Sequence, residues 1–334
     1  MLNNKVILIT GATGTFGKNF VTHLVSKFKC RKIIIFSRDE LKQHEFSNEK
    51  LIKGNKNIRF FLGDVRDLDR LKTAMSGVDI VIHAAALKQV PAAEYNPIEF
   101  IKTNIIGAQN IIEASVYNNV SKVIALSTDK AVQPINLYGA TKLASDKLFI
   151  AANNMYGEQK TRFSVTRYGN VVSSRGSVIP FFQDLLKNNS DFLPVTDIKM
   201  TRFFILQSEA VEFVIDNLKR MKGGEIFVPK LPSIKISDLA KAMSKNIKLK
   251  IIGKRPGEKV HEVMCPSEES ELTVEYKNHF VIYSHADKER IGKYPIDNMK
   301  EKGKFVITNF EYASNKNKNF LNTKQIIKLL KSIK

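Results

Sequence analysis

Two residues in the first half of the chain suit the oxidation of an alcohol. Tyr138 and Lys142 stand four positions apart, a spacing that places a phenol and an ammonium on one face of a helix. A phenol has a pKa of about 10 and is a poor base at neutral pH. A neighbouring ammonium favours the phenolate, so Tyr138 is suited to accept an alcohol proton as a hydride leaves. Any helix can carry this pair by chance, so the spacing alone does not establish a site.

A hydroxyl, a carboxyl and an amine precede that pair in the sequence. Thr128, Asp129 and Lys130 directly follow the apolar, β-branched stretch Val123–Ser127, which we predict to be a strand. In an open parallel sheet, ligands bind beyond the carboxyl ends of the strands. These three side chains are therefore expected in the same crevice as Tyr138. Their convergence is the strongest functional signal in the chain.

Alternating strands and helices must position these groups. Short apolar runs alternate with longer amphipathic ones, which argues for right-handed βαβ units with helices on both faces of the sheet. We predict an α/β fold built on a doubly wound parallel Rossmann sheet. The predicted strands are Lys5–Thr10, Lys32–Phe36, Ile58–Leu62, Asp79–His83, Val123–Ser127 and Ser164–Tyr168, and the predicted helices are Phe16–Phe28, Leu68–Met75, Ile98–Tyr117 and Leu137–Asn153.

The pattern becomes irregular after Asn170 and predicts a second, smaller lobe made of insertions. We expect a helix over 178–186, a loop around Pro194–Phe203, a helix over Ser208–Met221 and a strand over Glu225–Pro229. On this basis, residues 1–172 form the dinucleotide-binding Rossmann domain, and residues 207–230 return to it. Residues 173–206 and 231–334 form the C-terminal substrate-binding lobe.

A glycine-rich loop near the start of the chain predicts a dinucleotide site. Residues 11–17 read GATGTFG, between the first predicted strand and the first predicted helix. Small residues allow a phosphate close to the backbone and to the N–H groups of the helix N-terminus. A turn into a helix can also require glycine, but this strand–loop–helix context favours the dinucleotide. The contact residues are Gly11, Thr13, Gly14, Thr15, Phe16 and Gly17.

The end of the second predicted strand indicates which dinucleotide binds. Sites for NAD usually place an acid there, about 20 residues past the loop, whereas this chain has Ser37 and Arg38. A hydroxyl and a guanidinium suit the 2′-phosphate of NADP, and Lys42 supplies a second cation. Asp39 is the counter-argument, because a rotated loop would present it to a ribose. By position in the strand order we also assign Asp64, Val65, Ala84, Ala85, Ala86 and Val171 to NADP.

The composition fits a folded protein without unusual partners. The chain has 334 residues, and 53 basic against 33 acidic side chains give a formal net charge of +20. The basic residues are diffuse, so we expect a solvated surface and no nucleic-acid partner. No apolar stretch approaches the roughly 18 residues of a spanning helix, so no membrane association is expected. Cys30 and Cys265 form no disulfide framework and no metal-ligand pattern, which favours the reducing cytoplasm and no bound metal.

Many sequence blocks resemble a known family. The glycine loop, the YxxxK pair and the STDK segment resemble the extended short-chain dehydrogenase/reductase family. Within it, further blocks resemble the configuration-inverting UDP-N-acetylglucosamine 4,6-dehydratases, a group that supplies the first step toward pseudaminic acid for surface or flagellar glycosylation. These blocks are SRDELKQ (37–43), GDVRD (63–67), HAAALKQVP (83–91), EYNPIE (94–99), STDKAVQPINLYGATK (127–142), RYGNVVSSRGSVIPFF (167–182), MTRF (200–203) and RPGEKVHE (255–262).

The resemblance implies an intramolecular redox cycle on the sugar. Tyr138 takes the C4 hydroxyl proton while the C4 hydride passes to NADP⁺, Lys130 removes the C5 proton, and Asp129 protonates the C6 hydroxyl that leaves as water. The hydride then returns to C6, and reprotonation of C5 from the other face inverts that centre. A lysine is a credible base only if its pKa lies far below the usual value of about 10.4. Tyr138 is the alternative C5 base.

The resemblance also assigns substrate contacts and assembly. It implies UDP-N-acetylglucosamine as the partner and a homo-oligomer, a hexamer, as the working form. The substrate residues are Lys88, Thr128 and Asn170 for the sugar, Arg202 and Arg255 for the diphosphate, and Glu258 for the uridine ribose.

Two other interpretations stay open. One keeps the fold and cofactor but makes the chain a retaining dehydratase, a dehydratase with 5-epimerase output toward another sugar, or a 4-epimerase. Lys130 argues against ordinary retention, and Asp129 argues against an epimerase, which needs no acid for dehydration. The other is a non-enzymatic dinucleotide-binding regulator or nucleic-acid binder. A protein of that kind is expected to have lost parts of the active site, which this chain retains.

Overall fold

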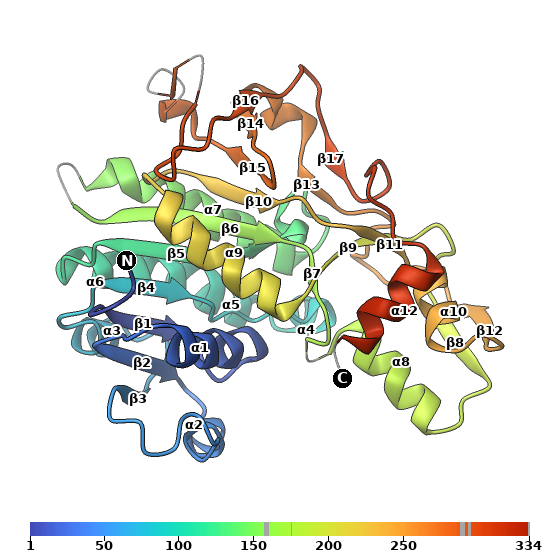
Figure 1. The fold of residues 1–334 in the computed structure, drawn as a ribbon, viewed down its shortest axis with the longest axis horizontal. Coiled ribbons are helices and arrows are strands. Elements are labelled where there is room, and N and C mark those ends of the chain that lie inside the picture. Colours follow the sequence, from blue (N-terminus) through green and yellow to red (C-terminus); the bar gives the residue numbers. More distant parts are fainter. Residues whose placement is uncertain (157–159, 175, 288–290, 293–294, 333–334) are drawn as a thin grey trace.

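A ten-stranded sheet forms the centre of the computed structural model, which describes residues 1–156, 160–174, 176–287, 291–292 and 295–332 (Figure 1). From edge to edge its order is β16-β14-β15-β10-β6-β5-β4-β1-β2-β3. The strands from β10 to β3 in this order all pair in parallel. They are β1 (Val6–Thr10), β2 (Lys32–Ser37), β3 (Ile58–Leu62), β4 (Ile80–His83), β5 (Lys122–Thr128), β6 (Arg162–Tyr168) and β10 (Ile226–Pro229).

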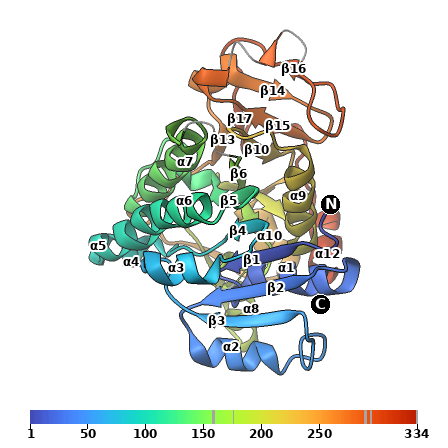
Figure 2. The same ribbon diagram turned by 90° about the vertical axis from the view of Figure 1, so that its left-hand side faces the viewer.

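The central strands are apolar because helices cover both faces of the sheet. Every residue of β1 and of β4 is buried, which explains their continuous β-branched sequences. Figure 2 shows α3, α6 and α7 on one face and α1 and α9 on the other. These helices are α1 (Thr15–Lys27), α3 (Leu68–Ala74), α6 (Gly107–Tyr117), α7 (Leu137–Met155) and α9 (Gln207–Arg220), and α2 (Glu40–Ser47) lies beside the β3 edge. The predicted doubly wound α/β fold is confirmed.

The predicted helix over 98–117 consists of several pieces. α4 (Val90–Tyr95) and α5 (Pro97–Phe100) lead into a π-helical turn, Ile101–Ile106, which continues into α6. Asn104 in that turn is buried, and its side chain contacts both the backbone of Leu87 and the hydroxyl of Thr141. The irregular turn thus ties the loop after β4 to α7, and both of these carry predicted site residues.

The second lobe has its own apolar core, separate from that of the sheet, and it lies beyond the carboxyl ends of the parallel strands (Figure 1). Two small sheets, β11-β9-β7 and β12-β8, pack with three helices around this core. The elements are β7 (Asn170–Val171), α8 (Val178–Lys187), β8 (Phe192–Val195), β9 (Thr201–Ile205), β11 (Ser233–Lys235), α10 (Ile236–Met243), β12 (Lys248–Ile251) and α12 (Thr323–Lys331).

The lobe corrects one sequence-based prediction. The segment Pro194–Phe203, predicted as a loop, contains the end of β8 and the start of β9. Both strands pair with segments more than 25 residues later in the chain, β12 and β11. Such pairing is invisible in the local sequence pattern. Arg175 of the matched block 167–182 lies outside the described residues.

The predicted domain boundary also differs from the structure. Three antiparallel strands within 231–334, which was assigned wholly to the lobe, extend the main sheet beyond β10: β14 (Thr273–Glu275), β15 (His279–Ile282) and β16 (Lys304–Phe305). They cover an edge that would otherwise expose unpaired backbone groups. A further pair, β13 (Val263–Cys265) and β17 (Tyr312–Ala313), connects this extension to the lobe. Among the described residues, no helix is both long enough and apolar enough to span a bilayer.

Candidate active site

A cavity of about 1430 Å³ runs along the carboxyl ends of the parallel strands and continues to the lobe. Its walls come from the glycine loop, the ends of β2 to β6, and the lobe segments around Arg202 and 255–262. Of the residues assigned to the site from the sequence, all of which the structure describes, only Asp129 does not line the cavity. The cavity is therefore continuous from the predicted cofactor end to the predicted sugar end.

The glycine loop provides a close-packed backbone cradle at one end. Gly11 has a φ of +63°, and a Cβ atom there would lie 2.8 Å from the Ala85 nitrogen. A Cβ atom on Gly17 would lie 2.4 Å from the Cα of Ala12. The first hydrogen bond of α1 is donated by Lys18, so the helix directs the amides of its first turn toward the cavity. This geometry fits the diphosphate of a dinucleotide.

The loop after β4 is held against β1 by Thr10. Its buried hydroxyl accepts hydrogen bonds from the amides of Ala84 and Ala85, each at 3.2 Å, and lies 2.9 Å from Nδ1 of His83. Burial lowers the pKa of His83 to about 3, and the nearby Lys142 acts in the same direction. His83 is thus a neutral, packed residue and not a proton-transfer group.

The predicted 2′-phosphate region lies where β2 ends. The hydroxyls of Thr13 and Ser37 are 2.9 Å apart, and the guanidinium of Arg38 is 3.5 Å from the carboxylate of Asp64. Asp39 is the N-cap of α2: its carboxylate accepts a hydrogen bond from the backbone amide of Lys42 and pairs with the Lys42 ammonium. These hydrogen bonds, first of all the one from the ammonium, lower the pKa of Asp39. Both Asp39 and Lys42 line the cavity, but each is already engaged by the other.

Tyr138 and Lys142 lie in the first turns of α7, which is capped by Asn136 accepting from the amide of Gly139. Both side chains are buried. Burial raises the pKa of Tyr138 to about 12, and Lys130 and a hydrogen bond with Thr128 oppose that shift. Lys130 is therefore a cation that favours the phenolate of Tyr138, whereas the sequence spacing suggested Lys142 for that role. Burial lowers the pKa of Lys142, against the charge of Asp146.

Asp146 is a site-supporting residue that the sequence analysis missed. It is completely buried, accepts a hydrogen bond of 2.6 Å from Ser127, and lies 3.5 Å from the guanidinium of Arg167. It stands four residues after Lys142 on α7, so the helical spacing alone was a usable signal. Asp146 ties the helix to the ends of β5 and β6 beneath the cavity.

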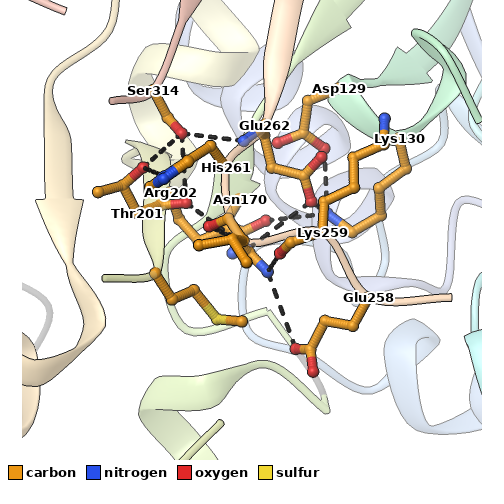
Figure 3. A network of polar contacts seen from close by, with 12 residues as sticks. Asp129, Lys130, Asn170, Thr201, Arg202, Glu258, Lys259, His261, Glu262 and Ser314 are labelled. Carbon is orange, nitrogen blue, oxygen red and sulfur yellow. Dashed lines mark hydrogen bonds and ion pairs between the residues drawn. The ribbon is translucent and has the colours of Figure 1, made fainter. Parts of the chain in front are cut away.

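Lys130 lies between two carboxylates. Its Nζ is 3.0 Å from Oδ1 of Asp129 and 3.4 Å from Oε1 of Glu262, and it donates to the Asn170 side chain at 3.4 Å (Figure 3). Burial lowers the pKa of Lys130, but Asp129 and Glu262 outweigh burial, and the net pKa is raised. The low pKa required of a lysine base is therefore not present in this state of the site. The sequence could not show this, because Glu262 lies 132 positions away.

Asp129 is positioned behind the cavity wall. It is completely buried, and its Oδ1 accepts from both the Thr128 hydroxyl and the Lys130 ammonium. Its Oδ2 has no hydrogen-bond partner in the described part of the chain. The Lys130 side chain thus separates this carboxyl from the cavity, and any proton from Asp129 reaches a ligand only after a local rearrangement or through its neighbours.

Arg202 holds a lobe segment in place. This buried guanidinium donates to the backbone carbonyls of Thr201, Lys259 and Val260 at 2.8–3.0 Å. It also lies 3.8 Å from the carboxylate of Glu258 and 3.7 Å from that of Glu262 (Figure 3). Most of its donors are thus used within the protein, whereas the other predicted diphosphate ligand, Arg255, is exposed at the cavity mouth.

The segment 255–262 rests on the loop between β5 and α7. The side chain of Asn136 donates to the carbonyl of Gly257 at 2.8 Å, and the ammonium of Lys259 donates to the carbonyl of Val132. Lys88 also lines the cavity; burial lowers its pKa, and repulsion from Lys130 adds to that shift. The lobe therefore supplies the wall of the predicted sugar end that contacts Lys130.

Comparisons with known proteins agree with the sequence-based resemblance. A family model described as "Polysaccharide biosynthesis protein" matches residues 7–284. A UDP-N-acetylglucosamine 4,6-dehydratase (inverting) of Campylobacter jejuni subsp. jejuni serotype O:23/36 (strain 81-176) is 54% identical over 333 residues, covering 99% of this chain and 98% of the relative. A UDP-glucose 4-epimerase of Rickettsia bellii (strain RML369-C) is 41% identical and covers 99% of this chain and 96% of its own. The X-ray structure of Pen from Bacillus thuringiensis has a TM-score of 0.89 and 36% identity, covering 100% and 99% of the two chains.

Proposed function

The chain belongs to the polysaccharide biosynthesis protein family, and we propose that it is an NADP-dependent, inverting UDP-N-acetylglucosamine 4,6-dehydratase. The observation that carries this proposal is the contact of Lys130 with Asp129 beside Tyr138, between the glycine-loop and lobe ends of one cavity. An epimerase needs an alcohol oxidant but no acid–base pair for loss of water. The product is UDP-2-acetamido-2,6-dideoxy-β-L-arabino-hex-4-ulose.

The cofactor proposal rests on the two ends of the dinucleotide. When bound, NADP supplies hydride transfer from C4 of the sugar and back to C6. The crowded glycines of the first loop and the first turn of α1 hold its diphosphate. Arg38 and Ser37 suit the 2′-phosphate, and Asp39 is already occupied as the cap of α2. This engagement of Asp39 favours NADP over NAD.

Tyr138 accepts the C4 hydroxyl proton in this proposal. Its neutral phenol is favoured by burial, so the proton transfer requires the positive charge of Lys130 and the hydrogen bond with Thr128. The charge of Asp146 opposes the effect of burial on the pKa of Lys142, and we assign Lys142 as a second ammonium one helical turn from Tyr138 on α7. Tyr138 and Lys142 therefore prepare the oxidation, and Thr128, Lys88 and Asn170 orient the sugar.

Asp129 and Lys130 supply both proton transfers of the elimination. The ion pair and the neutral pair differ by one proton moved across the 3.0 Å between Nζ and Oδ1. In the neutral pair, the amine of Lys130 takes the C5 proton. The carboxyl of Asp129, which lies behind Lys130 and needs a local rearrangement to reach the sugar, gives its proton to the C6 hydroxyl, which leaves as water. The raised pKa of Lys130 makes the ion pair the resting form. Return of a proton to C5 from the opposite face inverts that centre, and Tyr138 stays the alternative C5 base.

The test is the reaction of purified protein with UDP-N-acetylglucosamine and NADP in deuterated water, followed by NMR. We expect a 4-keto-6-deoxy product with L-arabino ring couplings and deuterium at C5. A product with the original C5 configuration would contradict the inversion alone. A galacto-configured product that keeps its C6 hydroxyl would establish the 4-epimerase, the activity in the name of the Rickettsia bellii relative. An unchanged sugar would overturn both enzymatic proposals.

Further parts of the proposal rest on the family resemblance. We infer that the product enters pseudaminic acid synthesis for surface or flagellar glycans, and that the chain works in the cytoplasm as a homo-oligomer, a hexamer. Light scattering of the purified protein measures the assembly, and a mass other than six chains would contradict it. Analysis of surface glycans after deletion of the gene tests the pathway.

A further inference from the structure

Glu262 is a buried acidic residue that the proposed mechanism leaves without a role. The residue is 1% exposed, and it lines the cavity beside Lys130. Its backbone is fixed from both sides by Ser314: the amide of Glu262 donates to the Ser314 hydroxyl at 2.9 Å, and the amide of Ser314 donates to the Glu262 carbonyl at 2.8 Å (Figure 3). A charged group held this rigidly away from water costs free energy unless its partners compensate.

One oxygen of Glu262 serves two cations. Oε1 lies 3.4 Å from Nζ of Lys130 and 3.7 Å from Nε of Arg202, whereas Oε2 is buried without a hydrogen-bond partner among the described residues. Arg202 faces the proposed diphosphate region of the cavity, and Lys130 faces the proposed sugar region. The carboxylate thus stands between the group that binds the nucleotide and the group that moves protons.

We propose that Glu262 is a positioning residue that couples Arg202 to Lys130 through this shared oxygen. This inference rests on the proposed function. While the diphosphate is absent, Glu262 divides its charge between the two cations and holds Lys130 as an ammonium. A bound diphosphate attracts the guanidinium of Arg202. The carboxylate of Glu262 then moves with Arg202 or turns its second oxygen toward it, and so moves away from Lys130. Asp129 is left as the carboxylate that contacts Lys130 and can accept its proton. Binding of the substrate thus makes the later proton transfer from Lys130 to Asp129 easier, while the pair stays ionic for the oxidation step at Tyr138.

Other charged groups around Lys130 act alongside Glu262. Asp129 lies closest, and Arg202 and Lys259 approach from the lobe. Lys88 and the phenol of Tyr138 face Lys130 from the remaining walls. Among the described lobe groups, Glu262 is the carboxylate that contacts Lys130, whereas Glu258 contacts Arg202 and the backbone amide of Arg255. This difference supplies a matched pair of variants.

The experiment compares pH profiles of C5 proton exchange, measured by NMR in deuterated water, for wild type, Glu262→Gln and Glu258→Gln. Transfer of the Lys130 proton to Asp129 leaves the number of bound protons unchanged, so the rising limb of the profile reports the loss of the Lys130 proton to solvent. Removal of a carboxylate at this distance lowers the pH of that loss by about 1 unit or more. In Glu262→Gln we therefore expect the rising limb of the profile to move to lower pH by that amount. Glu258→Gln is expected to raise KM without moving the limb.

The outcomes separate the inference from the proposed function. A lower rate at every pH with an unmoved limb in Glu262→Gln would show a purely structural role and overturn the inference. An equal shift in Glu258→Gln would overturn it as well, since the effect would then not pass through Lys130. If Glu262→Gln does not fold, Glu262→Asp takes its place, and we expect a smaller shift in the same direction; an unmoved limb contradicts the inference. Absence of exchange and of product in wild type would refute the proposed function itself.

Discussion

The two ends of the cavity are built from different materials. The cofactor end is made of backbone: a Cβ on Gly11 would meet main-chain atoms of the loop after β4, and a Cβ on Gly17 would meet main-chain atoms of the glycine loop itself. The sugar end is made of charged side chains: buried Asp129 and half-buried Lys130 from the turn after β5, and buried Glu262 from the lobe. A backbone cradle is specified within a few consecutive residues, whereas a charge network depends on how distant segments meet.

Loss of Lys130 is expected to have the largest effect and to leave the cofactor end intact. In Lys130→Ala, C5 exchange and dehydration fall by about 100- to 10,000-fold, the range typical of a lost proton-transfer group. NADP affinity, measured by fluorescence titration, stays at the wild-type value. Lys147→Ala, which removes an exposed lysine paired with Glu269, serves as the control and keeps full activity. Joint loss of NADP binding and activity would mean that the two ends are not separable.

A methyl group added to the glycine loop is expected to weaken NADP binding at the cofactor end of the cavity. In Gly17→Ala the new Cβ meets the Cα of Ala12 at 2.4 Å, so the loop must shift. Overpacking of this kind costs about 1–3 kcal/mol, and we expect NADP affinity to fall by about tenfold to a hundredfold. Gly54→Asn is the control, because the position is open and asparagine tolerates its positive φ. Unchanged NADP affinity in Gly17→Ala would contradict the backbone-cradle interpretation.

The preference for NADP depends on a side chain within the backbone-built end. Arg38→Ala removes charge-assisted hydrogen bonds worth about 1.5–3 kcal/mol, so NADP affinity is expected to drop by about tenfold or more while NAD affinity changes little. Isothermal titration with both dinucleotides measures the ratio. Equal losses for NAD and NADP would show that Arg38 does not contact a 2′-phosphate.

The smallest effect is expected at the amino ends of the central strands β1 and β4, on the side of the sheet away from the cavity, where we expect charge to affect stability and not activity. Asp79 accepts from the amide of Val6 at 2.8 Å and pairs with Lys5 at 3.1 Å. Burial raises the pKa of Asp79, but these partners outweigh burial and the net pKa is lowered. Asp79→Ala is expected to lose about 1 kcal/mol of unfolding free energy with activity unchanged.

The pH dependence of that loss provides its check. A carboxylate with a lowered pKa stabilises the fold above its unfolded pKa of about 3.9, and this stabilisation disappears as pH falls through the folded value. The difference between wild type and Asp79→Ala in urea unfolding should therefore be full at pH 7 and vanish in acid. Asp216→Ala, which removes an exposed partner of Lys219, is the control with little change. A constant difference at all pH values would exclude an electrostatic origin.

The sequence was sufficient wherever neighbouring residues carry the information. Periodicity located the parallel strands within a residue or two, because strands buried on both faces read as continuous apolar runs. The glycine spacing located the loop that lies against Ala84 and Ala85, because the close approach leaves no room for a Cβ atom at Gly11.

The sequence was insufficient wherever two distant segments meet. The segment Pro194–Phe203, which contains the end of β8 and the start of β9, was predicted as a loop because the partner strands β12, β11 and β7 lie far from it in the chain. The carboxylate of Glu262 contributes to the raised pKa of Lys130, and no residue near Lys130 in the sequence indicates that this carboxylate lies beside it. The burial of Asp129 behind Lys130 likewise follows from packing and not from the spacing of the STDK segment.

The packing of segment 255–262 against the loop between β5 and α7 has a consequence for the design of chimeras between such enzymes. The lobe supplies both Arg202, which is expected to hold the nucleotide, and Glu262, which contacts Lys130. These two residues lie on segments that are distant in sequence but in contact in space. Under the proposed function, a chimera that exchanges the lobe to change sugar preference exchanges part of the acid–base machinery as well. Substrate choice and stereochemical outcome would then be inherited together, and separating them would require a chimera junction between Arg202 and Glu262.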